Sequence, residues 1–228
     1  MVAHRKHSRQ ELDMSIVRVA AFSISLDGYG TGEPQTLEEP FGHAGQRLHD
    51  WMFPPETGGE TRARYGLDGA LAMASYDDDT VGAEIMGRRK YWPYPGDWTD
   101  PEWKGWWGDN PPFHTPVFVM THHQHESIEM EGGTTFHFVS GTPEEVLAQA
   151  RAAAGDKDVR IGGGPTTVRA FLAAGLIDHL HLVVAPIVLG HGESLWEGLE
   201  GIESDYDIRA TPSDRPGFVH QFWQRRGQ

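Results

Sequence analysis

The stretch Val159-Arg-Ile-Gly-Gly-Gly-Pro-Thr-Thr-Val168 decides how the rest of this chain is interpreted. A short run of strand-forming residues enters three glycines, and a helix is predicted to begin at once with Pro165. Glycines let the backbone approach a ligand closely, and a new helix presents N–H groups with a partial positive charge. The junction is therefore either a phosphate or pyrophosphate site or a tight turn that needs glycine only for its dihedrals. No Gly-Lys-Ser/Thr follows, so it is not a P-loop.

Outward from this junction, predicted strands and helices alternate along the chain. Hydrophobic periodicity and turn signals predict strands at 15–25, 83–87, 117–121, 135–139, 158–161, 178–185, 206–210 and 217–225. Helices are predicted at 44–53, 67–80, 142–154 and 165–175. Alternating elements followed by strands alone indicate an α/β protein with a mixed sheet flanked by helices.

Composition and charge exclude several classes of protein. The 228 residues hold 19 Lys and Arg against 33 Asp and Glu, a net charge of −14, which does not suit binding to nucleic acid or to an anionic membrane. The absence of Cys excludes disulfides and thiolate chemistry. The basic stretch 1–13 has no apolar core and is not a signal peptide. We expect a polar tail over 1–14, one domain over 15–228, and a cytoplasmic location.

Two other strand ends carry polar groups that could bind a ligand. Gly87-Arg88-Arg89 places arginines at the carboxyl end of a strand, where they could grip a phosphate or form an ordinary solvated pair. Thr121-His122-His123 also follows a strand. Neighbouring His residues on a strand do not converge on one ion, so no metal site is expected.

Two carboxylates are candidates for proton transfer, Asp27 after the first strand and Asp50 beside Trp51. An acid among apolar neighbours can have a raised pKa and donate a proton, although most isolated Asp residues cap helices or form turns. The segment 91–112 contains five tryptophans, which indicates either a substrate wall or a subunit interface.

Taken in order, several segments resemble the dihydrofolate-reductase-like superfamily, above all the reductase domain of the bifunctional riboflavin-biosynthesis deaminase-reductase and its stand-alone bacterial relatives. The segments are Ser25-Leu-Asp-Gly28, Ile85-Met-Gly-Arg88, Pro116-Val-Phe-Val-Met-Thr121, Ile161-Gly-Gly-Gly164, and Gly175-Leu-Ile-Asp178 followed by Ala185-Pro-Ile-Val-Leu-Gly190. The resemblance spans about 16–222. It implies a mostly parallel sheet of about eight strands, bound NADPH and a homodimer.

The resemblance also implies roles for individual residues. By analogy, the NADPH phosphates would lie near Gly87 and Arg88, and Thr121 and His122 would flank the 2′-phosphate. The pyrophosphate would rest on Gly162, Gly163, Gly164, Pro165 and Thr166. The substrate and nicotinamide pocket would be lined by Ser25, Gly28 and Trp51, with Asp27 and Asp50 as catalytic candidates.

The chain departs from dihydrofolate reductases at one position. They carry a carboxylate on the helix before the Met-Gly-Arg strand, but the matching position here lies near Leu71, with Asp68 the nearest acid, so folate is not the expected substrate. No deaminase zinc motif is present. We expect an NADPH-dependent reductase that transfers a hydride to a C=N or C=O bond of a small heterocyclic or sugar-like substrate. The alternative is a non-catalytic nucleotide-binding or interaction protein on the same fold.

Overall fold

The structure, a computed structural model, describes residues 15–52, 66–76 and 78–227. The tail predicted over 1–14 lies outside these ranges, as do Phe53 and Asp77, which belonged to two of the predicted helices.

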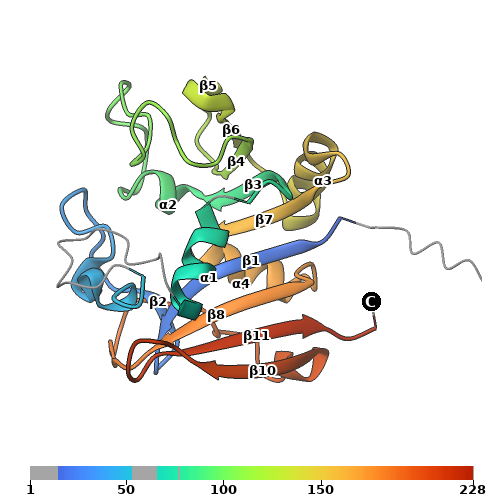
Figure 1. Cartoon of the computed structure of the whole chain (residues 1–228). Coiled ribbons are helices and arrows are strands. Elements are labelled where there is room, and N and C mark those ends of the chain that lie inside the picture. The colour runs from blue at the N-terminus through green and yellow to red at the C-terminus, as the bar shows by residue number, and fades with distance from the viewer. Residues whose placement is uncertain (1–14, 53–65, 77, 228) are drawn as a thin grey trace, which may run out of the picture.

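A sheet of nine strands forms the centre of the described fold (Figure 1). Its strand order is β10-β11-β8-β1-β7-β3-β4-β6-β5, and a small second sheet pairs β2 with β9. The strands are β1 (Val17–Ser25), β2 (Tyr29–Thr31), β3 (Val81–Gly87), β4 (Pro116–Met120), β5 (Ile128–Glu129), β6 (Thr135–Val139), β7 (Asp158–Gly163), β8 (His179–Ala185), β9 (Glu193–Ser194), β10 (Tyr206–Pro212) and β11 (Val219–Arg225). The six neighbours from β8 to β6 run parallel, which confirms the predicted mixed, mostly parallel sheet.

The helical segments differ from the predictions mainly at their ends. They are η1 (Gly42–Leu48), α1 (Gly66–Tyr76), α2 (Arg88–Tyr91), η3 (Glu131–Gly133), α3 (Pro143–Ala154), α4 (Pro165–Ala173) and η4 (Ile202–Asp205). The amphipathic helix predicted at 44–53 is a 3-10 segment broken by Gly45, whose φ is +54°. The helix predicted to reach Thr80 ends at Tyr76, and Asp78 instead accepts hydrogen bonds from the backbone and hydroxyl of Thr80.

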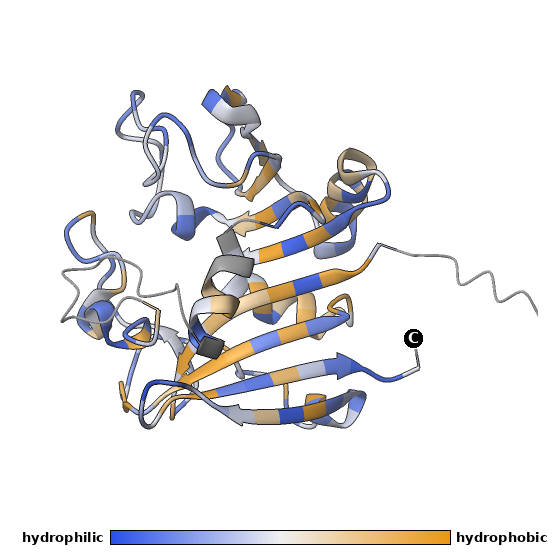
Figure 2. Cartoon of the chain, viewed as in Figure 1, coloured by the Kyte–Doolittle hydropathy of each residue, from blue (hydrophilic) through white to orange (hydrophobic). Residues whose placement is uncertain are grey.

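The sheet separates two apolar layers. On one face, α3 and α4 bury Val146 and Phe171 against Val159 and Ile161, and on the other α1 and η1 cover Val183 with a second cluster. A third cluster packs Tyr91 and the tryptophan-rich segment around Phe136. Apolar residues concentrate in the central strands (Figure 2). None of the helices in the described part of the chain is long and apolar enough to cross a membrane.

An extra residue interrupts β1. Along its pairing with β8, Val19 lies opposite Leu180 and Phe22 opposite Leu182, so Ala20 and Ala21 together face His181. Ala21 has a φ of +54°, which is unusual for a residue with a side chain. Val19 and Phe22 both point into the α3–α4 layer, whereas Ala21 points to the α1 side. The α3–α4 layer is therefore faced by odd-numbered residues of β1 before the bulge and by even-numbered residues after it.

The carboxyl ends of the parallel strands lie at the edge of the sheet occupied by η1 and α2 (Figure 1). The strands β1, β7, β3 and β4 are consecutive neighbours in the sheet, so their carboxyl ends lie side by side there. Ligands of open α/β sheets bind at such an edge. The fold therefore places the glycine junction, the arginines and the histidines on the same side of the molecule.

Candidate functional site

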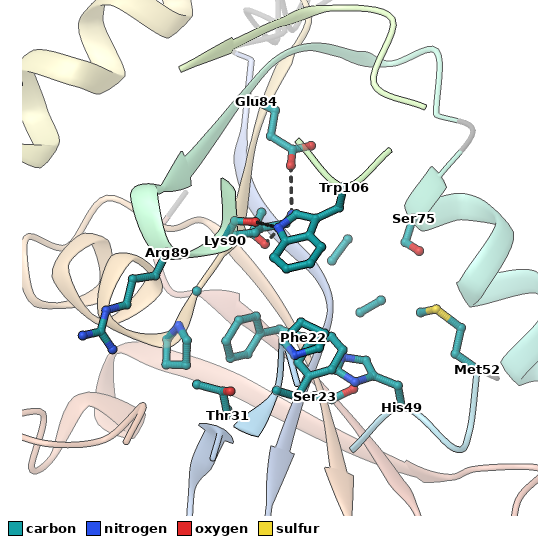
Figure 3. Close-up of a pocket in the computed structure, with 18 of the residues that line it drawn as sticks. Phe22, Ser23, Thr31, His49, Met52, Ser75, Glu84, Arg89, Lys90 and Trp106 are labelled. Carbon is teal, nitrogen blue, oxygen red and sulfur yellow. Dashed lines mark hydrogen bonds and ion pairs between the residues drawn. The ribbon is translucent and has the colours of Figure 1, made fainter. Parts of the chain in front are cut away.

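A cavity of about 390 Å³ opens at this edge, and residues of both α1 and α4 line it. Its walls come from the β1 bulge, the segment around η1, the ends of β3 and β7, α2 and the tryptophan-rich segment (Figure 3). It is of the size expected for a small-molecule site, and most of its walls are apolar or aromatic.

A buried ion cluster forms one wall of the cavity. Glu84 in β3 is 1% exposed, and its carboxylate accepts hydrogen bonds from Arg160 Nε at 2.7 Å and Lys90 Nζ at 3.2 Å. Lys90 also donates to the Gly162 carbonyl at 2.8 Å, and Arg160 donates to the Ser75 carbonyl at 2.6 Å. All five residues line the cavity.

Charge and burial act in opposite directions on this cluster. Burial alone would raise the pKa of Glu84, but the charges of Arg160 and Lys90 outweigh it and lower that pKa. Burial lowers the pKa of Lys90, and Glu84 offsets part of that shift. The cluster therefore brings two cations and one carboxylate to the cavity, a surplus of one positive charge in a protein of net charge −14.

The β7–α4 junction forms the adjoining wall. Gly164 is the N-cap of α4, no side chain caps the helix, and Gly164 and Pro165 line the cavity. A Cβ placed on Gly164 would have no atom within 4 Å, so this backbone faces open space. At Gly162, by contrast, a Cβ would lie 2.1 Å from the Glu84 carboxylate. Close approach of a ligand to the backbone is therefore possible at Gly164, and glycine at 162 makes room for the ion cluster.

A carboxylate of the chain itself lies in front of α4. Glu193 of β9 accepts hydrogen bonds from Arg89 Nη1 at 2.8 Å and from the Thr166 hydroxyl at 2.9 Å. Arg89 and Thr166 thus already hold an anionic group beside the N-terminus of α4. This arrangement suits a phosphate, which presents the same kind of oxygen acceptors.

Much of the remaining wall is aromatic, and it includes one half-buried histidine, His49. Trp106 and Trp107 come from the tryptophan-rich segment, and Phe22 and Phe41 from β1 and the segment before η1. Burial lowers the pKa of His49 to about 4, so its ring is neutral at physiological pH, and its Nδ1 is buried without a partner among the described residues.

The cofactor residues predicted at strand ends lie along the same edge, with varied surroundings. Arg88 donates to the carbonyls of Tyr94 and Gly96 at 2.6 and 2.5 Å and lies over the ring of Trp98, 4.5 Å from its centre. It therefore fastens the tryptophan-rich segment to the end of β3. Gly87 packs against α4, since a Cβ there would lie 2.2 Å from Thr167 Oγ1.

Four of the other predicted cofactor residues lie outside the cavity lining, namely Thr121, His122, Gly163 and Thr166. Thr121 is buried after β4, and its hydroxyl accepts from the His123 backbone N–H at 3.0 Å. His122 is exposed beside it. Gly163, with a φ of +102°, packs against Phe22. Thr166 does not line the cavity and lies instead beside Glu193. No group of three His, Cys, Asp or Glu residues in the described ranges is arranged to hold a metal ion.

The predicted acid Asp27 holds a turn. It accepts hydrogen bonds from the hydroxyl of Ser25 at 2.6 Å and from the backbones of Leu189 and Gly190 at 3.1 and 2.7 Å. Burial would raise the pKa of Asp27, but these hydrogen bonds lower it to about 2. The carboxylate is ionised at neutral pH and does not line the cavity, so its geometry does not suit a proton donor.

The other predicted substrate residues lie behind the cavity wall. Trp51 is 3% exposed and donates from Nε1 to Ser23 Oγ at 3.0 Å, and Ser23 rather than Trp51 lines the cavity. Asp50 and Gly28 are also outside the lining, and Gly28 faces Trp196.

Sequence reasoning missed Glu84, Lys90, Arg160 and His49. The signal was present for two of them, because Glu84 is the one charge in β3 and Arg160 lies between the apolar residues Val159 and Ile161 of β7, where a charge needs a buried partner.

Comparison with known proteins shows what the chain resembles. Residues 18–213 match a protein-family model described as the RibD C-terminal domain. A putative riboflavin biosynthesis protein from Shewanella sp. PV-4 is 22% identical, with a TM-score of 0.54, and the match covers 93% of this chain and 99% of that one. A pyrimidine reductase-like protein from Corynebacterium diphtheriae is 14% identical, with a TM-score of 0.50, over 94% of this chain and 93% of that one.

A third similar structure is a longer protein. It is a diaminohydroxyphosphoribosylaminopyrimidine deaminase/5-amino-6-(5-phosphoribosylamino)uracil reductase from Thermotoga maritima, 12% identical with a TM-score of 0.50, and the match covers 94% of this chain but 57% of that one. No curated protein matches the chain in sequence.

Proposed function

We propose that this chain, which belongs to the RibD C-terminal domain family, is an NADPH-dependent reductase of a C=N or C=O bond in a small heterocyclic or sugar-like substrate. The observation that carries the proposal is the open backbone at Gly164, where Arg89 and the N-terminus of α4 adjoin a substrate-sized cavity. These features suit a dinucleotide whose phosphates lie outside the cavity and whose nicotinamide enters it.

The residues that would hold the cofactor follow the strand ends. Gly164, Thr166 and Arg89 would bind the pyrophosphate, and Thr121 and His122, at the end of β4, would lie toward the 2′-phosphate. When bound, the reduced nicotinamide supplies a hydride. The protein supplies the cavity that excludes water and the groups that orient the acceptor.

Reduction of C=N or C=O also needs a proton at the nitrogen or oxygen, and Lys90 is the group we assign to it. An ammonium has three N–H donors, and the contacts of Lys90 to Glu84 and Gly162 engage two of them. Burial lowers the pKa of Lys90, which makes its ammonium a stronger acid. Lys90 would donate a proton to the heteroatom and recover one from solvent.

Calorimetric titration with NADPH, NADH and FMN tests the cofactor assignment. We expect NADPH to bind most tightly and Gly164→Val to weaken binding at least tenfold, because the branched side chain fills the space a phosphate needs. Gly164 has a φ of −66°, which lies outside the left-handed region that favours glycine. Gly163→Val would be a poorer probe, since its φ of +102° disfavours any side chain.

Two comparisons make this test specific. Gly164→Ala, which adds one carbon, should weaken binding less than Gly164→Val, and Glu193→Gln should strengthen it by removing a competing carboxylate. Binding unchanged by Gly164→Val would refute the phosphate placement. Absence of NADPH binding would favour the interaction protein, and tight binding with no turnover on a panel of C=N and C=O substrates would favour the non-catalytic nucleotide-binding protein.

The expected homodimer and cytoplasmic location are also part of this proposal. Exposed Leu26 and Val188 lie on two turns joined by the Leu26 N–H to Ile187 carbonyl bond of 2.8 Å, and they offer apolar surface for a second subunit. Sedimentation velocity at micromolar concentration tests the dimer, and Leu26→Asp should shift it toward monomer.

A further inference from the structure

A series of hydrogen-bonded polar side chains reaches the cavity wall and has no role in the chemistry proposed above. It runs from Asp68 in α1 through His220 in β11 and His181 in β8 to the backbone of Ala21 in β1. Asp68 Oδ1 lies 2.9 Å from His220 Nε2, His220 Nδ1 lies 2.9 Å from His181 Nε2, and the Ala21 N–H donates to His181 Nδ1 at 3.1 Å.

The Ala21 N–H, the donor at one end, fixes the position of every proton in this hydrogen-bonded series. Because His181 Nδ1 accepts from the Ala21 N–H, its proton must be on Nε2, which donates to His220 Nδ1. His220 then carries its proton on Nε2 and donates to the Asp68 carboxylate. Both rings are neutral in this arrangement. Burial and the neighbouring His220 lower the pKa of His181 to about 3, which agrees with a neutral ring.

Asp68, at the other end of this hydrogen-bonded series, is held by further hydrogen bonds. Asp68 is 8% exposed and also accepts from the hydroxyl of Ser213 at 2.7 Å and from the Asp214 backbone at 3.1 Å. His220 is fully buried, and its ring lies nearly perpendicular to that of Trp51, with the ring centres 5.2 Å apart.

At the near end, His181 replaces a lost ladder bond. At the bulge, Ala20 and Ala21 face one residue of β8, so one backbone N–H has no partner in regular pairing. The imidazole of that same residue, His181, accepts it. Ala21 also has a φ of +54°, a conformation that a residue with a side chain keeps only when its surroundings hold it.

The bulge matters to the site because it lines the cavity. Ala20, Ala21, Phe22 and Ser23 all form its wall, and Phe22 packs against Gly163 of the β7–α4 junction. A shift of the Ala21 peptide would therefore move the part of the wall that packs against Gly163.

We propose that His181 is a positioning residue that fixes the bulged Ala21 peptide and so shapes the cavity wall, with His220 and Asp68 holding its ring. The geometric part of the proposal stands on the described contacts alone. Its effect on ligand binding rests on the proposed function.

A matched pair of variants isolates the bond to Ala21. His181→Asn and His181→Leu both break the link to His220, but only Asn keeps an acceptor near the position of Nδ1. Amide hydrogen exchange of the full chain, followed by NMR, should show the Ala21 amide exchanging at least tenfold faster in His181→Leu. In His181→Asn its rate should stay within about threefold of the parent.

NADPH titration of the same proteins then tests the consequence. We expect about tenfold weaker binding for His181→Leu and less than threefold for His181→Asn, since an unsatisfied buried N–H changes the wall in the first variant only. If Ala21 exchange is unchanged in His181→Leu, or equally fast in both variants, the positioning role is overturned. If exchange responds but NADPH binding does not, Ala21 is held by His181 without shaping the ligand site, and the proposal also fails.

The exchange experiment needs no ligand. Failure of the parent to bind NADPH would thus refute the proposed function and leave the contact to Ala21 tested on its own. In the parent, ¹⁵N spectra of the imidazoles should show both rings as Nε2–H tautomers, and a different tautomer of His181 would contradict the chain of hydrogen bonds. Should His181→Leu fail to fold, this signature still tests the bond to Ala21, and His181→Asn still tests whether the acceptor alone preserves binding.

Discussion

Replacing Glu84 with Gln removes the only negative charge of the buried ion cluster. The side chain is 1% exposed and lies between Arg160 and Lys90, so water cannot take over the role of its carboxylate. Gln has the same shape, and the substitution opens no cavity. Two cations are left close together at the cavity wall with one amide oxygen between them.

The expected loss of stability is large. Removing one partner from a buried ion pair costs about 3–5 kcal/mol, because the remaining charge is uncompensated. In a chain of this length each kcal/mol lowers the melting temperature by about 2–4 °C, so Glu84→Gln should melt about 6–20 °C below the parent. The pKa of Glu84 is lowered in the folded state, so its contribution is complete above its ordinary pKa of 4.5 and is lost as the pH falls below that value.

Thermal unfolding of parent and variant at pH 7 and pH 4 tests both statements. The difference in melting temperature should be largest at pH 7 and narrow toward pH 4. Asp207→Asn is the matched control, because Asp207 is also bonded to an arginine, Arg226 Nε at 2.9 Å, but the two side chains are 72% and 57% exposed. It should change stability by less than about 1 kcal/mol. A Glu84→Gln variant as stable as this control would refute the reasoning.

Two further substitutions probe the ends of strands. Asp27→Asn should destabilise the fold by about 1 kcal/mol at pH 7, since the exposed carboxylate holds the backbones of Leu189 and Gly190. Because its folded pKa is about 2, denaturant titrations should show this difference at pH 5 and its loss between about pH 4 and pH 2. Gly87→Ala should cost about 1–3 kcal/mol in urea unfolding, because its Cβ would meet Thr167 Oγ1 at 2.2 Å. Thr167→Ala should relieve most of that loss, and an equal loss in both backgrounds would show that the contact is not the cause.

Local signals in the sequence predicted the elements that depend on neighbouring residues. The Thr142 hydroxyl accepts from the Glu145 backbone, and the Glu145 side chain accepts from the Thr142 backbone, as the spacing of these residues predicts for a helix start. The glycine junction likewise follows β7 and begins α4 where the sequence places it. Such features need only a few adjacent residues.

Features that join distant segments were missed. Lys90 stands in a row of three basic residues that resembles a solvated surface, and only the pairing of β3 with β7 brings Arg160 to the carboxylate of Glu84 beside it. Lys90, which we propose as the proton donor, was not among the candidates predicted from the sequence, because its contact with Gly162 joins residues more than 70 positions apart in the chain.

The bulge in β1 also left no local signal, because an insertion of one residue is visible only against the partner strand.

That insertion means that β1 carries one residue more than regular pairing with β8 needs. A deletion of Ala21 would leave Ala20 alone opposite His181, with Phe22 two residues after Val19. Val19, Phe22 and Ile24 would then still face the layer of α3 and α4, as in a strand of regular alternation. In a library of single-residue deletions, Ala21 should therefore be one of the better tolerated positions of β1 for folding, and its loss should show instead in the shape of the cavity wall that it lines.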